Sequence, residues 1–120
     1  MTDDFGLYNY RAKVIRIVDG DTYELMVDLG MKVFHLAHIR LEDVDTPEVY
    51  GVRHDSEEYA EGVEASSFVG SVMSPGTEVL IHTDKDKKSF NRYVAKITLP
   101  DGSDLGGVIL ESGHGEIEEE

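Results

Sequence analysis

The 120-residue chain contains no cysteine, so neither a disulfide framework nor a thiolate zinc site can stabilise it. Basic residues are also few, because 11 Lys and Arg stand against 25 Asp and Glu and give a formal net charge of -14. Such a charge repels the phosphates of nucleic acid, so any contact with nucleic acid has to be made locally. Acidity alone indicates solubility or adaptation to salty surroundings.

Long hydrophobic runs are missing too, since no segment approaches the length of a membrane-spanning helix. The first five residues lack the basic start and apolar stretch of a secretory signal. We therefore expect no membrane partner and a cytoplasmic protein, or a secreted one if a leader was removed. A short acidic chain is also compatible with a phage-encoded protein.

The length and the hydrophobic fraction of 40% fit one globular domain, which we expect to be a monomer. We predict an N-terminal extension over residues 1–9, the domain over residues 10–115 and an acidic tail over residues 116–120.

Alternating apolar and polar residues predict five strands, over residues 10–18, 22–28, 32–41, 77–83 and 92–99. The main helix is predicted over residues 56–73, and a short C-terminal helix from about Leu105 is ended by Gly113. We expect an irregular loop over residues 42–56, a charged connection over residues 84–88 and a frayed tail over residues 116–120. This order predicts a mainly β (α+β) protein, a five-stranded OB-fold Greek-key barrel, although a generic α+β sheet has the same order.

Two polar motifs close apolar runs: Asp19-Gly20-Asp21-Thr22, and Arg40 followed by Asp45-Thr46-Pro47-Glu48. Ca²⁺ prefers carboxylate and carbonyl oxygens, so Asp21, Asp45 and a backbone carbonyl are candidate ligands. The planar fork of Arg40 suits a phosphate, and Glu48 remains as a candidate base or water-orienting group. This set predicts a phosphodiesterase.

Simpler roles are open for some of these residues. A turn whose side chains bond their own backbone accounts for Asp19. Arg40 could form a structural ion pair with Asp45 or Glu48. In the loop, Tyr50 and Arg53 are candidates for stacking on a base of the substrate.

Further residues fit one known family. Together they are Ile17-Val18-Asp19-Gly20-Asp21-Thr22, Ile39-Arg40-Leu41, Val44-Asp45-Thr46-Pro47-Glu48, Gly62, Glu64-Ala65, Phe68 and Asn91-Arg92-Tyr93. In these residues, and in the spacing from Arg40 to Asp45 and Glu48, the chain resembles the staphylococcal nuclease-like (thermonuclease) family. The resemblance runs from Val14 to about Gly113.

The resemblance implies an OB-fold barrel and Ca²⁺-dependent cleavage of DNA or RNA. By motif, Asp21 and Asp45 correspond to the carboxylates that bind Ca²⁺, and Thr46 corresponds to the residue that supplies a carbonyl oxygen. Glu48 corresponds to the residue that orients or deprotonates the attacking water.

Arg40 and Arg92 resemble the two guanidiniums that hold the scissile phosphate and neutralise charge in the transition state. The sequence departs from the family just before Arg92, where Ser89 and Phe90 replace a usual Lys and Tyr. Three upstream lysines are candidates to replace part of the lost phosphate contact: Lys85, Lys87 and Lys88.

A rival interpretation from another class is a non-catalytic module that binds nucleic acid or protein on the same barrel. The nuclease is favoured because a module without catalysis does not need the complete set of Asp21, Arg40, Asp45, Glu48 and Arg92.

Overall fold

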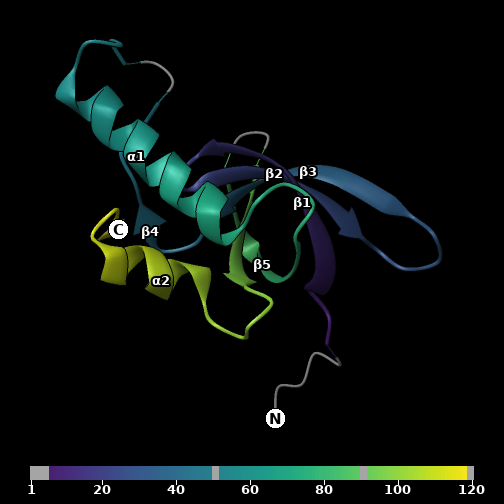
Figure 1. Ribbon diagram of the computed structural model, residues 1–120. Coiled ribbons are helices and arrows are strands. Elements are labelled where there is room, and N and C mark those ends of the chain that lie inside the picture. The colour runs from purple at the N-terminus through teal and green to yellow at the C-terminus, as the bar shows by residue number, and fades with distance from the viewer. Residues whose placement is uncertain (1–5, 50–51, 90–91, 119–120) are drawn as a thin grey trace.

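A computed structural model of the protein describes residues 6–49, 52–89 and 92–118, with only the backbone described for residues 85–89. Five strands close into a barrel in the order β1-β2-β3-β6-β5 (Figure 1). They are β1 (Asn9–Asp19), β2 (Thr22–Asp28), β3 (Phe34–Leu41), β5 (Glu78–Ser89) and β6 (Arg92–Thr98). The predicted five-stranded barrel is therefore confirmed.

Side-chain alternation explains why these segments form a barrel with a packed interior. Along β2, Tyr23, Leu25 and Val27 are buried, whereas the residues between them are partly exposed. Because successive side chains of a strand point to opposite faces, this pattern places one face of the sheet in the core. All neighbouring strands run antiparallel except β3 and β6, which pair in parallel from Ile39 to Leu41.

Two helices, α1 (Glu57–Val72) and α2 (Leu105–Ser112), pack against the barrel as predicted (Figure 1). The hydroxyl oxygen of Ser56 caps α1 by accepting a hydrogen bond from the Tyr59 amide at 3.1 Å. Gly113, with a φ of 82°, ends α2 in the left-handed conformation that favours glycine. In the part of the chain that the structure describes, neither helix is long and apolar enough to cross a membrane.

Two segments that were expected to be irregular form a small second sheet. Strand β4 (Val44–Asp45) pairs with β7 (Glu116–Ile117), although the sequence predicted a loop and a frayed tail at these positions. The prediction was wrong because strands of two residues are too short for periodicity to show. The pairing matters because it brings the tail of the chain to Asp45.

Strand β5 is also longer than predicted, since it continues through residues 84–89, where a charged connection was expected. Charge does not prevent this, because the backbone groups alone form the ladder that pairs Lys88 with Tyr93 and Ser89 with Arg92.

The hairpin formed by β2 and β3 extends well beyond the body of the barrel (Figure 1). Its turn closes with a hydrogen bond from the Val33 amide to the Gly30 carbonyl at 2.9 Å. The two central residues, Met31 and Lys32, have φ values of 54° and 63°. Left-handed backbone costs a residue other than glycine roughly 1–2 kcal/mol, so this turn is strained at both positions. The turn also explains why β3 begins at Phe34 rather than at Lys32.

Candidate functional site

The candidate site lies at the end of the barrel where the β1–β2 turn meets the end of β3. The turn is held by the buried phenol of Tyr23, which donates a hydrogen bond to the Gly20 carbonyl at 2.5 Å. It is joined to β3 by the Leu41 amide, which donates to the Asp21 carbonyl at 2.9 Å. In the β2–β3 ladder Thr22 lies opposite Arg40, so the two polar motifs of the sequence meet here.

Arg40 is the centre of the site, and its side chain is only 13% exposed. Its Nη1 donates to the carbonyls of Leu41 at 2.8 Å and of Val44 at 2.5 Å. Its Nη2 donates to Asp45 Oδ1 at 3.0 Å, which is the ion pair that the sequence left open. The same nitrogen lies 3.5 Å from Asp21 Oδ2 and 3.4 Å from Glu118 Oε2. Three carboxylates therefore share one edge of the guanidinium.

Both aspartates of the β1–β2 turn hold the loop that carries Glu48. Asp21 Oδ2 accepts the amide of Thr46 at 3.0 Å, and Asp19 Oδ1 accepts the amide of Val49 at 3.1 Å. Asp19 thus reaches beyond its own turn, which the sequence did not predict. The two hydrogen bonds bracket Glu48, whose exposed side chain forms no hydrogen bond or ion pair with the described residues.

Glycines let neighbouring elements approach this loop closely. A Cβ atom on Gly62 of α1 would lie 2.4 Å from the carbonyl oxygen of Glu48. A Cβ atom on Gly20 would lie 2.7 Å from Oγ1 of Thr46. That hydroxyl is buried and has no hydrogen-bond partner among the described residues. The loop is therefore packed between α1 and the β1–β2 turn.

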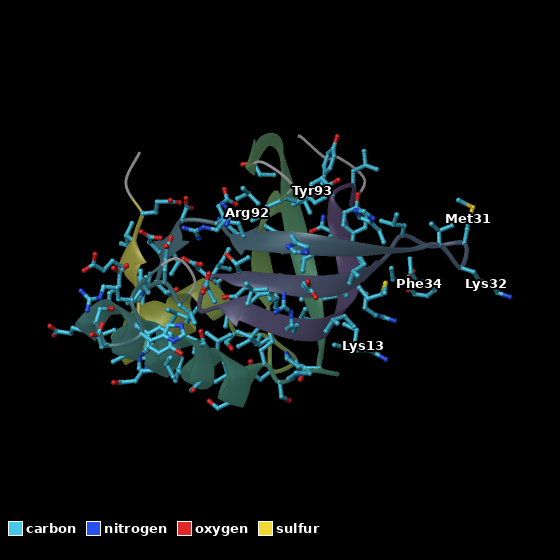
Figure 2. The ribbon with its side chains drawn as sticks, turned by 90° about the horizontal axis from the view of Figure 1, so that it is seen from above. Lys13, Met31, Lys32, Phe34, Arg92 and Tyr93 are labelled. Carbon is cyan, nitrogen blue, oxygen red and sulfur yellow. The ribbon has the colours of Figure 1, made fainter. Side chains whose placement is uncertain are left out.

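Arg92 joins the site through Thr22. Its Nη1 donates to Thr22 Oγ1 at 3.5 Å, and this hydroxyl in turn donates to Asp21 Oδ1 at 3.2 Å. Figure 2 shows Arg92 beside β3, at the end of the strand that is remote from the hairpin tip. The structure therefore brings together Asp21, Arg40, Asp45, Thr46 and Arg92.

The pKa of the Asp45 carboxyl is raised above its ordinary value of 3.8. Partial burial is the largest cause, and the negative charges of Asp21 and Glu118 add to it, whereas Arg40 acts in the opposite direction. Asp45 also borders a hollow of about 390 Å³, whose lining includes Glu58 and Glu61 of α1. This environment favours the approach of a cation.

Asp21 and Asp45 suit a hard divalent cation, because both carboxylates lie within 3.5 Å of the same Arg40 nitrogen and supply the oxygen ligands that such a cation prefers. Among the described residues, no group of three or more His, Asp or Glu side chains could hold a metal ion. A Ca²⁺ ion takes 6–8 oxygen ligands, which include carbonyls, water and substrate, so two carboxylates fit as part of its shell.

The remaining predicted site residues are less well placed. Arg53 is exposed and pairs with Asp55 at 2.9 Å, which offers no support for base stacking. Tyr50 and Phe90 lie outside the described residues. Ser89 and the predicted phosphate-binding lysines belong to the segment of β5 whose side chains are not described, namely Lys85, Lys87 and Lys88.

Two residues of the site were missed by the sequence analysis. Thr22 could have been found from the register of the β2–β3 hairpin, in which it lies opposite Arg40. Glu118 had no local signal, since its contact with Arg40 spans 78 positions and depends on the pairing of β4 with β7.

Comparison with known proteins agrees with this geometry. The model of the family described as staphylococcal nuclease homologue matches residues 38–119. The chain belongs to this family. The match covers Arg40, the loop to Glu48, α1 and Arg92, whereas the β1–β2 turn with Asp21 lies before it.

A curated relative of this family member is endonuclease YhcR of Bacillus subtilis (strain 168). The two proteins are 29% identical over 109 residues, which cover 88% of this chain but 9% of the relative. The chain thus spans about a tenth of the length of the relative that it matches.

Gly62→Ala should displace the loop that carries Glu48, because its Cβ atom would overlap the Glu48 carbonyl. We expect a loss of roughly 1–3 kcal/mol in the free energy of unfolding, measured by urea denaturation. Gly70→Ala on the same helix is the matched control, since nothing lies within 4 Å of its Cβ position. The control should be neutral or stabilising by up to about 1 kcal/mol. Equal effects of both variants would contradict the close packing at Gly62.

Asp45→Asn should stabilise the metal-free protein at neutral pH. The raised pKa means that the folded protein holds this proton more tightly than the unfolded chain does, so stability falls as the pH rises above 3.8. Thermal unfolding in chelator between about pH 4 and pH 7 should show a smaller decline for the variant than for the wild type.

Asp101→Asn is the control of opposite sign for Asp45→Asn. Hydrogen bonds from Ser103 lower the pKa of the Asp101 carboxyl, so its ionised form stabilises the fold and its loss should lower the melting temperature at neutral pH. If Asp45→Asn lowered the melting temperature as well, attraction to Arg40 would outweigh burial and repulsion at Asp45.

Proposed function

We propose that this domain hydrolyses phosphodiester bonds of DNA or RNA with the help of Ca²⁺. The observation that carries the proposal is the guanidinium of Arg40, held within 3.5 Å of Asp21 and within 3.0 Å of Asp45 at one end of the barrel. Membership of the staphylococcal nuclease homologue family and similarity to an endonuclease support it. The match covers 9% of that endonuclease, so the proposal concerns this domain alone.

The arginines are proposed to bind the scissile phosphate. Two backbone carbonyls hold Nη1 of Arg40, so the edge that carries Nη2 can exchange its carboxylate partners for phosphate oxygens. Arg92, linked to the site through Thr22, supplies the second guanidinium. Attack on a phosphodiester adds negative charge to a group that is already anionic, and each group placed there in advance contributes about a hundredfold or more to the rate.

Asp21, Asp45 and the Thr46 carbonyl are proposed to hold Ca²⁺, which would polarise a phosphoryl oxygen as a Lewis acid. Glu48 is proposed to orient or deprotonate the attacking water. Its backbone is fixed by the hydrogen bonds at Thr46 and Val49, while its exposed carboxylate can accept a proton. The loop thus combines a rigid backbone with an accessible base.

Glu48→Gln keeps the shape of the side chain and removes its charge, so turnover should fall by about a hundredfold or more while nucleic acid still binds. Plasmid nicking by the wild type should require Ca²⁺ and stop in chelator. Glu111→Gln, an exposed change on α2, is the matched control and should keep full activity. A wild type that binds DNA but never nicks it would favour the non-catalytic module, and an active Glu48→Gln would remove Glu48 from the reaction.

Glu118→Gln should tighten the binding of phosphate ligands, because the Glu118 carboxylate occupies Nη2 of Arg40. This side chain is 48% exposed, and exposed ion pairs contribute little, so we expect a gain of roughly two- to fivefold in affinity. Calorimetric titration with a nucleoside bisphosphate measures the change. Glu116→Gln removes the same charge from β7 and should have a smaller effect; equal gains would indicate a general effect of net charge.

A further inference from the structure

The tip of the β2–β3 hairpin exposes more apolar side chains than any other described segment of similar length. The exposed fractions are 44% for Leu29, 95% for Met31, 51% for Val33, 59% for Phe34 and 50% for Leu36. The other exposed large apolar residues of the described chain are scattered over several elements, as is normal for a soluble surface. The cluster at the tip therefore needs a separate explanation.

Both faces of the hairpin tip carry exposed apolar side chains, so packing of one face on the barrel would not bury them all. Neighbouring residues of a strand point to opposite faces, yet Val33 and Phe34 are both more than half exposed. Closer to the barrel, Val27 and Ala37 are buried, which marks the point where the hairpin leaves the core. An extended hairpin with two apolar faces is suited to enter an apolar medium, rather than to lie flat on a surface.

The strained turn supports a role for the tip residues. Asn-Gly is the pair favoured where two successive residues have positive φ, but this chain has Met31 and Lys32 there. Strained backbone that is kept in place of a favourable alternative points to a function for the side chains concerned. Figure 2 shows Met31 and Lys32 at the far end of the hairpin, with Phe34 behind them and Lys13 on the neighbouring strand β1.

The charge near the hairpin is opposite in sign to that of the whole chain. Residues 9–18 and 22–38 contain four basic residues, Arg11, Lys13, Arg16 and Lys32, and two acidic residues, Glu24 and Asp28. Glu24 pairs with Arg16 at 3.3 Å, so these two charges compensate one another, and Asp28 accepts the Gly30 amide at 2.9 Å. Glu78 of β5 lies opposite Lys13, so the local excess of basic residues is small.

The acidic residues of α1 and of the C-terminal segment lie at the opposite end of the molecule from the tip (Figure 1). The longest Cα dimension is 47 Å, whereas charges in physiological salt are screened beyond about 8 Å. An anionic partner at the tip would therefore meet the basic residues and not the net charge of -14.

We propose that the hairpin tip is a docking surface for an anionic lipid bilayer, with Leu29, Met31, Val33 and Phe34 entering the interface and Lys32 and Lys13 facing the headgroups. Peripheral binding combines an apolar insertion with attraction to anionic lipid, and it needs no spanning segment. The expectation of no membrane partner rested on the absence of such a segment, which this surface does not require.

A lipid partner fits the tip better than nucleic acid does. Three of the four inserted side chains are aliphatic, and bases are held mainly by stacking on planar rings. Met31 is also nine residues along the chain from Arg40, which corresponds to about 30 Å of extended strand. The proposal is therefore independent of the proposed nuclease activity.

The test is co-sedimentation with phosphatidylcholine vesicles, with and without phosphatidylglycerol, in chelator so that Ca²⁺ does not bridge protein and lipid. The wild type should bind the anionic vesicles and not the neutral ones. The double variant Met31→Asn with Lys32→Gly should bind at least tenfold more weakly, yet melt at a higher temperature because it relieves the strained turn. Lys32→Gln alone should weaken binding roughly fivefold.

Val63→Asn removes an exposed apolar side chain from α1 and is the matched control, which should bind vesicles like the wild type. Absence of wild-type binding, or equal binding to neutral and anionic vesicles, would overturn the proposal. The proposal would also be overturned if the wild type were a dimer and the double variant a monomer, because a second copy of the chain would then cover the tip. A third result would assign the tip to nucleic acid instead. In that case the wild type would not bind vesicles, and the double variant would lose binding to a short single-stranded DNA.

Discussion

The end of the barrel that carries the candidate site depends on the contacts of one group, the guanidinium of Arg40. Asp21 is only 7% exposed, and a buried carboxylate without a partner typically destabilises a protein by about 3–5 kcal/mol. Arg40 supplies that partner while its other nitrogen holds the carbonyls of Leu41 and Val44. One side chain therefore joins the β1–β2 turn, the end of β3 and strand β4. Through Glu118 it also holds the tail of the chain.

The same arrangement makes stability and phosphate binding compete for one group. Burial is the main cause of the raised pKa of Asp45, and repulsion from the Asp21 and Glu118 carboxylates that also contact Arg40 adds to it. A phosphate that bound Arg40 would add negative charge to this cluster, so a cation between Asp21 and Asp45 would offset repulsion already present. The surroundings can sustain this because hydrogen bonds from Asp19 and Asp21 and the close approach of Gly62 fix the loop that carries Glu48.

Charge is distributed unevenly over the molecule, which changes the meaning of the net value of -14. The first three strands outside the site carry more basic than acidic residues, whereas α1 and the C-terminal segment are rich in glutamate. Arg40 of the candidate site contacts the acidic C-terminal segment through Glu118. Two different anionic partners could therefore approach one acidic protein, a phosphodiester at the site and a lipid surface at the hairpin tip.

Local features were determined by the sequence itself. Alternation along residues 22–28 reflects contact of one strand face with a core, and the caps at Ser56 and Gly113 act within one helical turn, so the strands and both helices could be predicted. The spacing of Asp21, Arg40 and Asp45 likewise indicated a shared site. Tertiary structure alone decided that Asp19 holds Val49, that Gly62 packs on Glu48 and that Glu118 pairs with Arg40. These contacts join distant positions, up to 78 residues apart, and they exist only because closure of the barrel brings its strand ends together, which no local periodicity encodes.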